Sequence, residues 1–187
     1  VDYTTAKTSD GKGYTYQGYY YKRSYNDPTY YYCYYIPSGL TEVTITRQTS
    51  IPERAFYNCD LIERIRIPDG VDSIGASAFY GCAQLKRLNG SSDGAFNLPS
   101  GIASVQAGAF RGCSSATELS LPEGLESIGE SAFEGCPMVS KVGSENPGEI
   151  VVPASCTSIG ANAFRGMALI TGVTVGDSAE SIGSGAF

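Results

Sequence analysis

The stretch IPDGVDSIGASAFYGC, from Ile67 to Cys82, decides the fold because its pattern recurs along the chain. Its Ala-Phe pair returns at six phenylalanines: Phe56, Phe79, Phe110, Phe133, Phe164 and Phe187. The intervals between them alternate between 23 and 31 residues. A fixed period of this size is the signature of a solenoid built from stacked repeats.

Other apolar positions fall into the same register. An aliphatic residue lies five positions before each phenylalanine: Ile51, Ile74, Val105, Ile128, Ile159 and Ile182. Three positions before the last five of these comes a second aliphatic or small residue: Val71, Ile102, Leu125, Cys156 and Ala179. Upstream, four copies contain an apolar-x-apolar-Pro segment, ending at Pro68, Pro99, Pro122 and Pro153. This alternation predicts a short strand that ends in a proline turn.

A unit of about 23 residues cannot enclose a core alone, so its apolar residues must pack on those of neighbouring coils. We therefore expect the phenylalanines to form one continuous internal spine. Glycine follows most of the isoleucines and occurs in the Pro-Asp-Gly and Pro-Glu-Gly turns at Gly70 and Gly124. We expect these glycines to occupy turns that need positive φ. The extra residues of the longer units, within 89–94 and 143–148, are expected to be loops on one side of the array.

Composition excludes several classes of function. The chain of 187 residues contains no His, which removes Ser-His-Asp and Cys-His nucleophiles and every histidine metal site. The net charge of −6 disfavours nucleic acid as a partner. Apolar runs are too short for membrane insertion, and no zinc-binding CxxC pair is present. We expect neither an enzyme, nor a metal site, nor a cofactor.

The repeat from Ile67 to Cys82 resembles the BspA-like class of leucine-rich repeats, and the resemblance extends from about Leu40 to the C-terminus. It implies an α/β leucine-rich-repeat solenoid, mostly short strands with short helical turns. Proteins of this class are mostly cell-surface or secreted molecules of bacteria and some microbial eukaryotes, with roles in adhesion. The resemblance implies that kind of role and no particular ligand.

Residues 1–39 do not match the repeat. Twelve of the 14 tyrosines precede Ile36, and the segments from Gly13 and from Thr29 alternate well enough to predict two strands with a turn near 26–28. Solenoid ends need a cap, so we expect this segment to be a Tyr-rich β cap on residues 40–187. Tyrosine also suits ligand contact, so direct binding stays open for six residues: Tyr19, Tyr20, Tyr21, Tyr30, Tyr31 and Tyr32.

Cysteine lies three residues after four of the phenylalanines, at Cys59, Cys82, Cys113 and Cys136, and Met167 replaces it in the fifth copy. Replacement by methionine indicates a buried apolar position, so we expect reduced structural thiols. Cys33, outside the repeat, leaves open a disulfide to Cys59. The repeat register explains most carboxylates, including Asp69 and Glu123, as solvated turn residues.

Ligands of horseshoe repeats usually contact the strand face, where side chains flanking the buried aliphatics point outward. Those positions are Glu42, Thr44, Arg64, Arg66, Glu118, Ser120, Glu149, Val151 and Thr174. The chain stops just after a core position at Phe187, so we expect the array to be truncated at its C-terminus.

The sequence thus predicts a secreted or surface-displayed protein that mediates adhesion or binds a protein or glycan on host or neighbouring cells. Two alternatives stay open. One is a structural spacer or self-assembling repeat module. The other is a non-catalytic appendage of a larger surface enzyme. The sequence leaves the oligomeric state undecided.

Overall fold

The structure is a computed structural model that describes residues 2–7, 13–24, 27–37, 40–90, 94–137, 139–140 and 148–187. The chain divides into two compact units, residues 1–41 and 42–187. The side chains of the first unit's strands, and of residues 139–140, lie outside the described part. Each unit is described below by itself.

The first unit is a three-stranded antiparallel sheet in the order β1-β2-β3. Its strands are β1 (Asp2–Lys7), β2 (Gly13–Ser24) and β3 (Asp27–Pro37). In β2 and β3, Tyr20 pairs with Cys33, and Ser24 pairs with Asp27. The antiparallel pairing of β2 and β3 confirms the hairpin that was predicted in the Tyr-rich segment. The strand β1 was not predicted. The role of this sheet as a cap stays a prediction.

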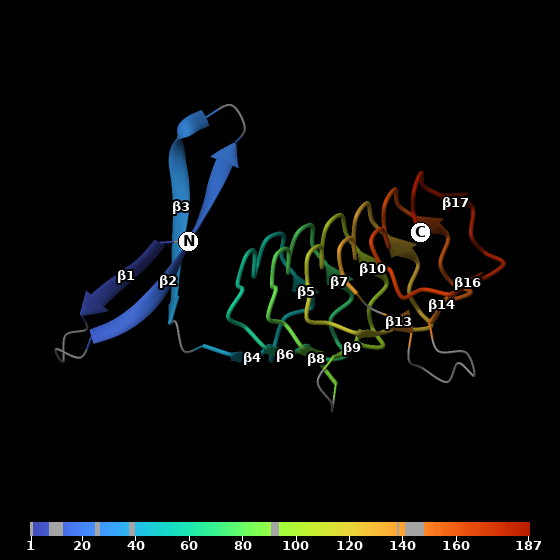
Figure 1. Ribbon diagram of the computed structural model, residues 1–187, viewed down its shortest axis with the longest axis horizontal. Coiled ribbons are helices and arrows are strands. Elements are labelled where there is room, and N and C mark those ends of the chain that lie inside the picture. Colours follow the sequence, from blue (N-terminus) through green and yellow to red (C-terminus); the bar gives the residue numbers. More distant parts are fainter. Residues whose placement is uncertain are drawn as a thin grey trace. The chain divides into compact units, whose positions relative to one another are not determined.

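The second unit is a solenoid whose strands line two sides of the stacked coils (Figure 1). One six-stranded parallel sheet contains β5 (Ser50–Ile51), β7 (Ser73–Ile74), β10 (Ser104–Val105), β12 (Ser127–Ile128), β15 (Ser158–Ile159) and β17 (Ser181–Ile182). The other six-stranded sheet contains β4 (Glu42–Thr44), β6 (Arg64–Arg66), β8 (Arg87–Leu88), β9 (Ala95–Asn97), β11 (Glu118–Ser120) and β13 (Val139–Ser140). A separate parallel pair contains β14 (Glu149–Val152) and β16 (Gly172–Val175).

The predicted helical turns are wrong: the described residues contain no helix, so the solenoid is built from strands and turns rather than being α/β. The reason is visible between Pro52 and Asn58, where only alternate N–H groups bond within the coil. Ala55 donates to the Pro52 carbonyl at 3.3 Å, whereas Phe56 donates to Ala78 of the next coil at 2.7 Å. Positive φ angles at Arg54 and Asn58 interrupt any helical run.

These cross-coil bonds make the turn segment a third ladder along the solenoid. Phe79 donates to the Ala109 carbonyl at 2.7 Å, and Phe110 donates to the Ala132 carbonyl at 2.8 Å. Alternate N–H groups of the turn segment are therefore satisfied by the neighbouring coil rather than by their own.

The predicted phenylalanine spine is confirmed. Successive rings stack with centroids 5.1 to 5.5 Å apart and planes within 9° of parallel. The cysteine position forms a second buried column that Met167 continues. In that column the Cys113 thiol donates to the Phe79 carbonyl at 3.3 Å, and the Cys136 thiol donates to the Phe110 carbonyl at 3.0 Å. The core is therefore a set of parallel columns with one residue from each coil.

The glycine expectation needs correction. Glycines that follow the buried isoleucines, such as Gly75 and Gly129, are absent from the positive-φ residues, as are Gly70 and Gly124. A Cβ atom on Gly129 would instead lie 2.5 Å from the Ala107 nitrogen in the preceding coil. Close approach of two backbones, rather than backbone conformation, therefore excludes a side chain at Gly75 and at Gly129.

The longer repeats add strands as well as connecting residues. In the first of them, β8 and β9 both join the sheet that starts at β4, and Leu88 pairs with Phe96. In the second, β13 pairs with β11, while β14 pairs with β16. Most of the predicted loop residues, namely 91–93 and 143–147, lie outside the described part. The β4 side thus has more strands than the β5 side.

Candidate ligand-binding face

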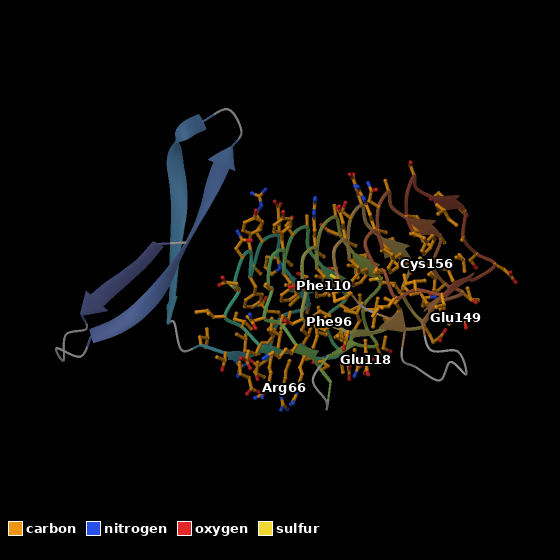
Figure 2. All side chains as sticks on the ribbon, viewed as in Figure 1. Arg66, Phe96, Phe110, Glu118, Glu149 and Cys156 are labelled. Carbon is orange, nitrogen blue, oxygen red and sulfur yellow. The ribbon has the colours of Figure 1, made fainter. Side chains whose placement is uncertain are left out.

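Strand alternation gives the β4–β13 sheet an outward face. Val43, Ile65 and Leu88 share one register, and Ile65 and Leu88 are buried. The residues that flank them therefore point away from the core. Figure 2 shows Arg66 and Glu118 on the outer side of the coils and Phe96 and Phe110 inside.

Three arginines occupy neighbouring positions on this face. Arg64 pairs in register with Glu42 on one side and with Arg87 on the other, and Arg66 lies beside Thr44. A hollow of about 570 Å³ lies over β6 and β8, and all three arginines are among the residues that line it. We call Arg64, Arg66 and Arg87 the arginine cluster.

Glu42 contacts two arginines of this cluster. Its Oε2 lies 3.9 Å from Nη1 of Arg64, and its Oε1 lies 3.5 Å from Nε of Arg66. The Arg66 side chain is nonetheless 72% exposed, and the side chains of Arg64 and Glu42 are each 44% exposed. Exposed ion pairs of this kind contribute about 0 to 1 kcal/mol, so solvent and ligands compete with them easily.

Asn89 orders one wall of the hollow. Its Nδ2 donates to the Ile67 carbonyl at 2.8 Å, and its Oδ1 accepts from the Ile67 N–H at 2.8 Å. Asn89 adopts a φ of 52°, a conformation that asparagine tolerates better than most residues. The side-chain amide therefore replaces a missing backbone partner at the end of β6 and fixes the chain beside Arg66.

The structure brings only part of the predicted set together. Arg64 and Arg66 line the hollow, with Glu42 and Thr44 on the adjacent strand β4. Glu118 and Ser120 lie further along the same sheet on β11, beyond β8 and β9. Between these groups, the face has no residue from the predicted set.

The last three predicted residues lie on the separate pair β14 and β16. Val151 pairs in register with Thr174 and is 44% exposed. The Thr174 hydroxyl donates to Oε1 of Glu149. These residues are outward, as predicted, but they form a different surface from the arginine cluster.

The Tyr-rich set lies on β2 and β3. Tyr19 pairs with Tyr34, and Tyr21 pairs with Tyr32. The side chains of all six candidate tyrosines lie outside the described part, as does that of Cys33. Cys59, its suggested disulfide partner, is buried.

Sequence reasoning missed Arg87 and Asn89. The apolar-x-apolar-Pro pattern at Phe96–Pro99 predicts the strand of this repeat and does not indicate a further strand before the extra residues. The signal was available, because Arg87 and Leu88 lie 23 residues after Arg64 and Ile65. Asp69, interpreted as a solvated turn residue, is exposed as predicted and also lines the hollow.

A second outward row follows the repeat phenylalanines: Tyr57, Tyr80, Arg111, Glu134 and Arg165. The rings of Tyr57 and Tyr80 stack at 4.9 Å, and the Arg111 guanidinium lies 5.8 Å from the centre of the Tyr80 ring. Glu134 pairs with Arg111 at 3.2 Å and with Arg165 at 3.8 Å. This row therefore holds arginines that are exposed and paired, like Arg66, but away from the strand face.

The buried thiols are poorly suited to nucleophilic chemistry. Burial raises the pKa of Cys82 and Cys113 well above the ordinary value of 9.0, with neighbouring thiols adding to the shift. Burial also raises the pKa of Cys156. Because the thiolate is the reactive species, these cysteines stay neutral and inert at physiological pH. The buried cysteines of the repeats are Cys59, Cys82, Cys113, Cys136 and Cys156.

Two other features are absent from the described residues. No group of three His, Cys, Asp or Glu residues in this part of the chain is arranged to hold a metal ion. Within the same residues, no helix is long and apolar enough to cross a bilayer.

Solved structures with this fold come from bacteria. A leucine-rich repeat protein from Bacteroides ovatus is 27% identical, covers 91% of the chain and has a TM-score of 0.65. The T. pallidum leucine-rich repeat protein is 25% identical, covers 91% of the chain and has a TM-score of 0.61. The match spans 43% of the B. ovatus protein and 67% of the T. pallidum protein. A comparison with curated proteins finds no match.

The repeat pattern also matches a defined family. The BspA type leucine rich repeat region, in six copies, matches residues 29–136 and 90–187. Together these matches cover most of the sequence, including all six phenylalanines of the spine. The chain therefore belongs to the BspA-type leucine-rich repeat family.

Proposed function

We propose that this chain is a secreted or surface-displayed binding module that holds a protein or glycan ligand on its β4–β13 strand face. The observation that carries the proposal is the hollow over β6 and β8, with three arginines in its lining. Arginine is enriched at protein interfaces and suits planar, multidentate hydrogen bonding. Because the three arginines lie outside the repeat core, other residues can replace them without loss of the fold.

The repeat architecture supports a binding role over catalysis. Its core columns keep an apolar or small residue at each position, whereas the outward residues differ in charge and polarity between coils. Solenoids of this kind present extended surfaces for binding. Family membership supports the proposed location at the cell surface or outside the cell.

The test is binding of the intact chain to arrayed matrix proteins and glycans. A variant with R64Q, R66Q and R87Q should lose the ligands that the native chain retains. A matched variant with R54Q, R111Q and R165Q removes the same charge from the turn face and should keep them. Circular dichroism confirms that both variants are folded.

Further arms separate the other candidates. Serine at Tyr19–Tyr21 and Tyr30–Tyr32 tests the Tyr-rich segment as a binding surface. If both arginine variants bind like the native chain and the serine variant fails, the ligand site belongs to residues 1–39. If the native chain binds no arrayed molecule, the strand-face proposal is wrong.

A self-assembling module is a second candidate, favoured by the apolar surface of the last coil. Val173, Ile182 and Phe187 are exposed there, and Val173 and Phe187 line a hollow of about 400 Å³. The Phe187 ring stacks on Phe164 at 5.4 Å, and its outer face is the surface on which a further coil would pack, whether from the same chain or from a second copy. Concentration-dependent light scattering that I182D abolishes would support this candidate, while a constant monomer mass would reject it.

A further inference from the structure

We infer that the arginine cluster recognises an extended acidic peptide segment whose carboxylates recur at every second residue. This inference rests on the proposed function of the strand face and names the chemistry of its ligand.

Positive charge on this face is local. The chain has a net charge of −6, yet Arg64, Arg66 and Arg87 lie on two adjacent strands. Outward positions on either side are acidic or neutral: Glu42 and Thr44 on β4, Asn97 on β9, Glu118 and Ser120 on β11. The anionic part of a ligand is therefore confined to the width of β6 and β8.

Glu42 shows what the cluster accepts. Its two carboxylate oxygens approach two different guanidinium groups, at 3.9 Å for Arg64 and 3.5 Å for Arg66. Both contacts are longer than a good charge-assisted hydrogen bond, which is about 2.7 to 2.9 Å. A ligand carboxylate that approaches the hollow directly can make shorter bonds, so Glu42 acts as an exchangeable internal competitor.

Strand geometry selects the spacing. Arg64 and Arg66 are alternate residues of one strand, so their Cα atoms are about 6.6 to 6.8 Å apart. An extended peptide repeats its side chains on one face with the same period, which brings carboxylates at i and i+2 opposite both arginines. Arg87, in register with Arg64 on the adjacent strand, is about 4.8 Å away and can share the first carboxylate.

A polyanionic polysaccharide is the competing class, because it also offers carboxylates or sulfates. Its charges follow the sugar repeat rather than the strand repeat. The spacing of Arg64 and Arg66 therefore favours the peptide, and a polysaccharide enters the experiment as the alternative outcome.

The experiment measures fluorescence anisotropy of three labelled peptides with the intact chain. In one, Glu alternates with Ala. The second contains the same residues with the Glu in a block, and the third replaces each Glu of the first by Gln. We expect the alternating peptide to bind about fivefold more tightly than the block peptide, and the Gln peptide to show no binding. Binding should weaken as salt rises, because exposed charges are screened.

Two substitutions should act in opposite directions on the alternating peptide. R66Q should weaken binding by about tenfold, whereas E42Q should strengthen it by roughly threefold because it removes the internal competitor. R165Q and E180Q make the same charge changes on exposed residues away from the hollow, so neither should alter binding by more than about twofold.

Equal affinity for the alternating and block peptides would overturn the inference, as would stronger displacement by dextran sulfate than by unlabelled peptide. A weaker complex with E42Q would also overturn it. Failure here leaves the proposed function intact if an arrayed ligand still depends on the arginine cluster. Failure of the array as well would reject both.

Discussion

The ring of Phe110 stacks on the ring of Phe133 in the next coil, with centroids 5.4 Å apart and planes 5° apart. Phe110 also stacks on Phe79 with ring centroids 5.1 Å apart, and it makes a T-shaped contact with Phe96 with centroids 5.7 Å apart. It is therefore packed by aromatic rings from three directions and is fully buried. Because each coil packs only on its neighbours, contacts such as these transmit stability along the array.

Replacing Phe110 by Ala should lower the free energy of unfolding by about 3 to 5 kcal/mol, because it leaves a cavity in the middle of the spine. Phe187, at the same repeat position, has a neighbour on one side and is 46% exposed. F187A should therefore cost about 1 kcal/mol or less. Urea denaturation followed by circular dichroism gives both values. Equal losses would show that the spine does not stabilise the array in this way.

Gly129 should not tolerate a methyl group. A Cβ there would lie 2.5 Å from the Ala107 nitrogen, and backbone cannot move aside without breaking the ladder between coils. G129A should lower the free energy of unfolding by about 2 to 3 kcal/mol. Gly124 is the matched control because its added Cβ would lie 3.7 Å from the nearest atom. G124A should change the same free energy by about 0.5 kcal/mol or less, and a loss comparable to that of G129A would refute the steric explanation.

The buried thiols should make the fold sensitive to alkali. The pKa values of Cys82 and Cys113 are raised by burial, so the unfolded chain loses these protons above about pH 9 while the folded chain keeps them. The unfolded state then binds fewer protons, so the free energy of unfolding falls as pH rises. Between about pH 8.5 and pH 10.5 we expect the native chain to lose about 4 kcal/mol more than a C82A/C113A variant, about 2 kcal/mol for each thiol.

Urea midpoints across that pH range, measured for both proteins, provide the check. Tyrosines ionise in the same range, but they are identical in the two proteins and cancel in the comparison. Parallel pH profiles would contradict the prediction and show that the two thiols ionise in the folded chain as readily as in the unfolded one.

Asn89 should matter to stability and to binding together. N89A removes the two hydrogen bonds to Ile67 and leaves that backbone unpaired, at a cost of about 2 kcal/mol. Because Asn89 also lines the hollow, the same variant should lower the affinity of the arginine cluster for its ligands. Asn97, exposed on the adjacent strand β9, serves as control, and N97A should leave both properties near native. Calorimetry of unfolding and peptide anisotropy report them separately, and a native melting temperature for N89A would contradict the structural role.

Several features of the fold were predictable because they depend on short-range patterns. The phenylalanine period predicted the spine, Met167 in place of a cysteine predicted a buried apolar column, and alternation predicted the hairpin of β2 and β3. The helical turns were wrong because repeat spacing does not show where each N–H bonds. The Phe56 N–H bonds to the carbonyl of Ala78 in the next coil, and this acceptor is in reach only because the coils stack.

The candidate site was predictable only in part. Alternation around Ile65 placed Arg64 and Arg66 on the outer face, since neighbouring residues of a strand point to opposite sides. It could not show that Arg87 lies beside Arg64, because the proline-ended segment that followed was the more obvious strand. Nor could it separate these residues from Glu149 and Thr174, which share the outward pattern but lie on another sheet.

The sequence by itself determined the family, the repeat register and the identity of the core columns, because one residue from each coil must meet its equivalents in the next. Tertiary structure alone decided which outward residues become neighbours. Strand pairing joins Arg64 to Arg87, which lie 23 positions apart in the sequence. The strand β9, added in the first longer repeat, separates β8 from β11 in the sheet. The arginine cluster exists because β6 and β8 pair in register, a relation between coils that no single repeat contains.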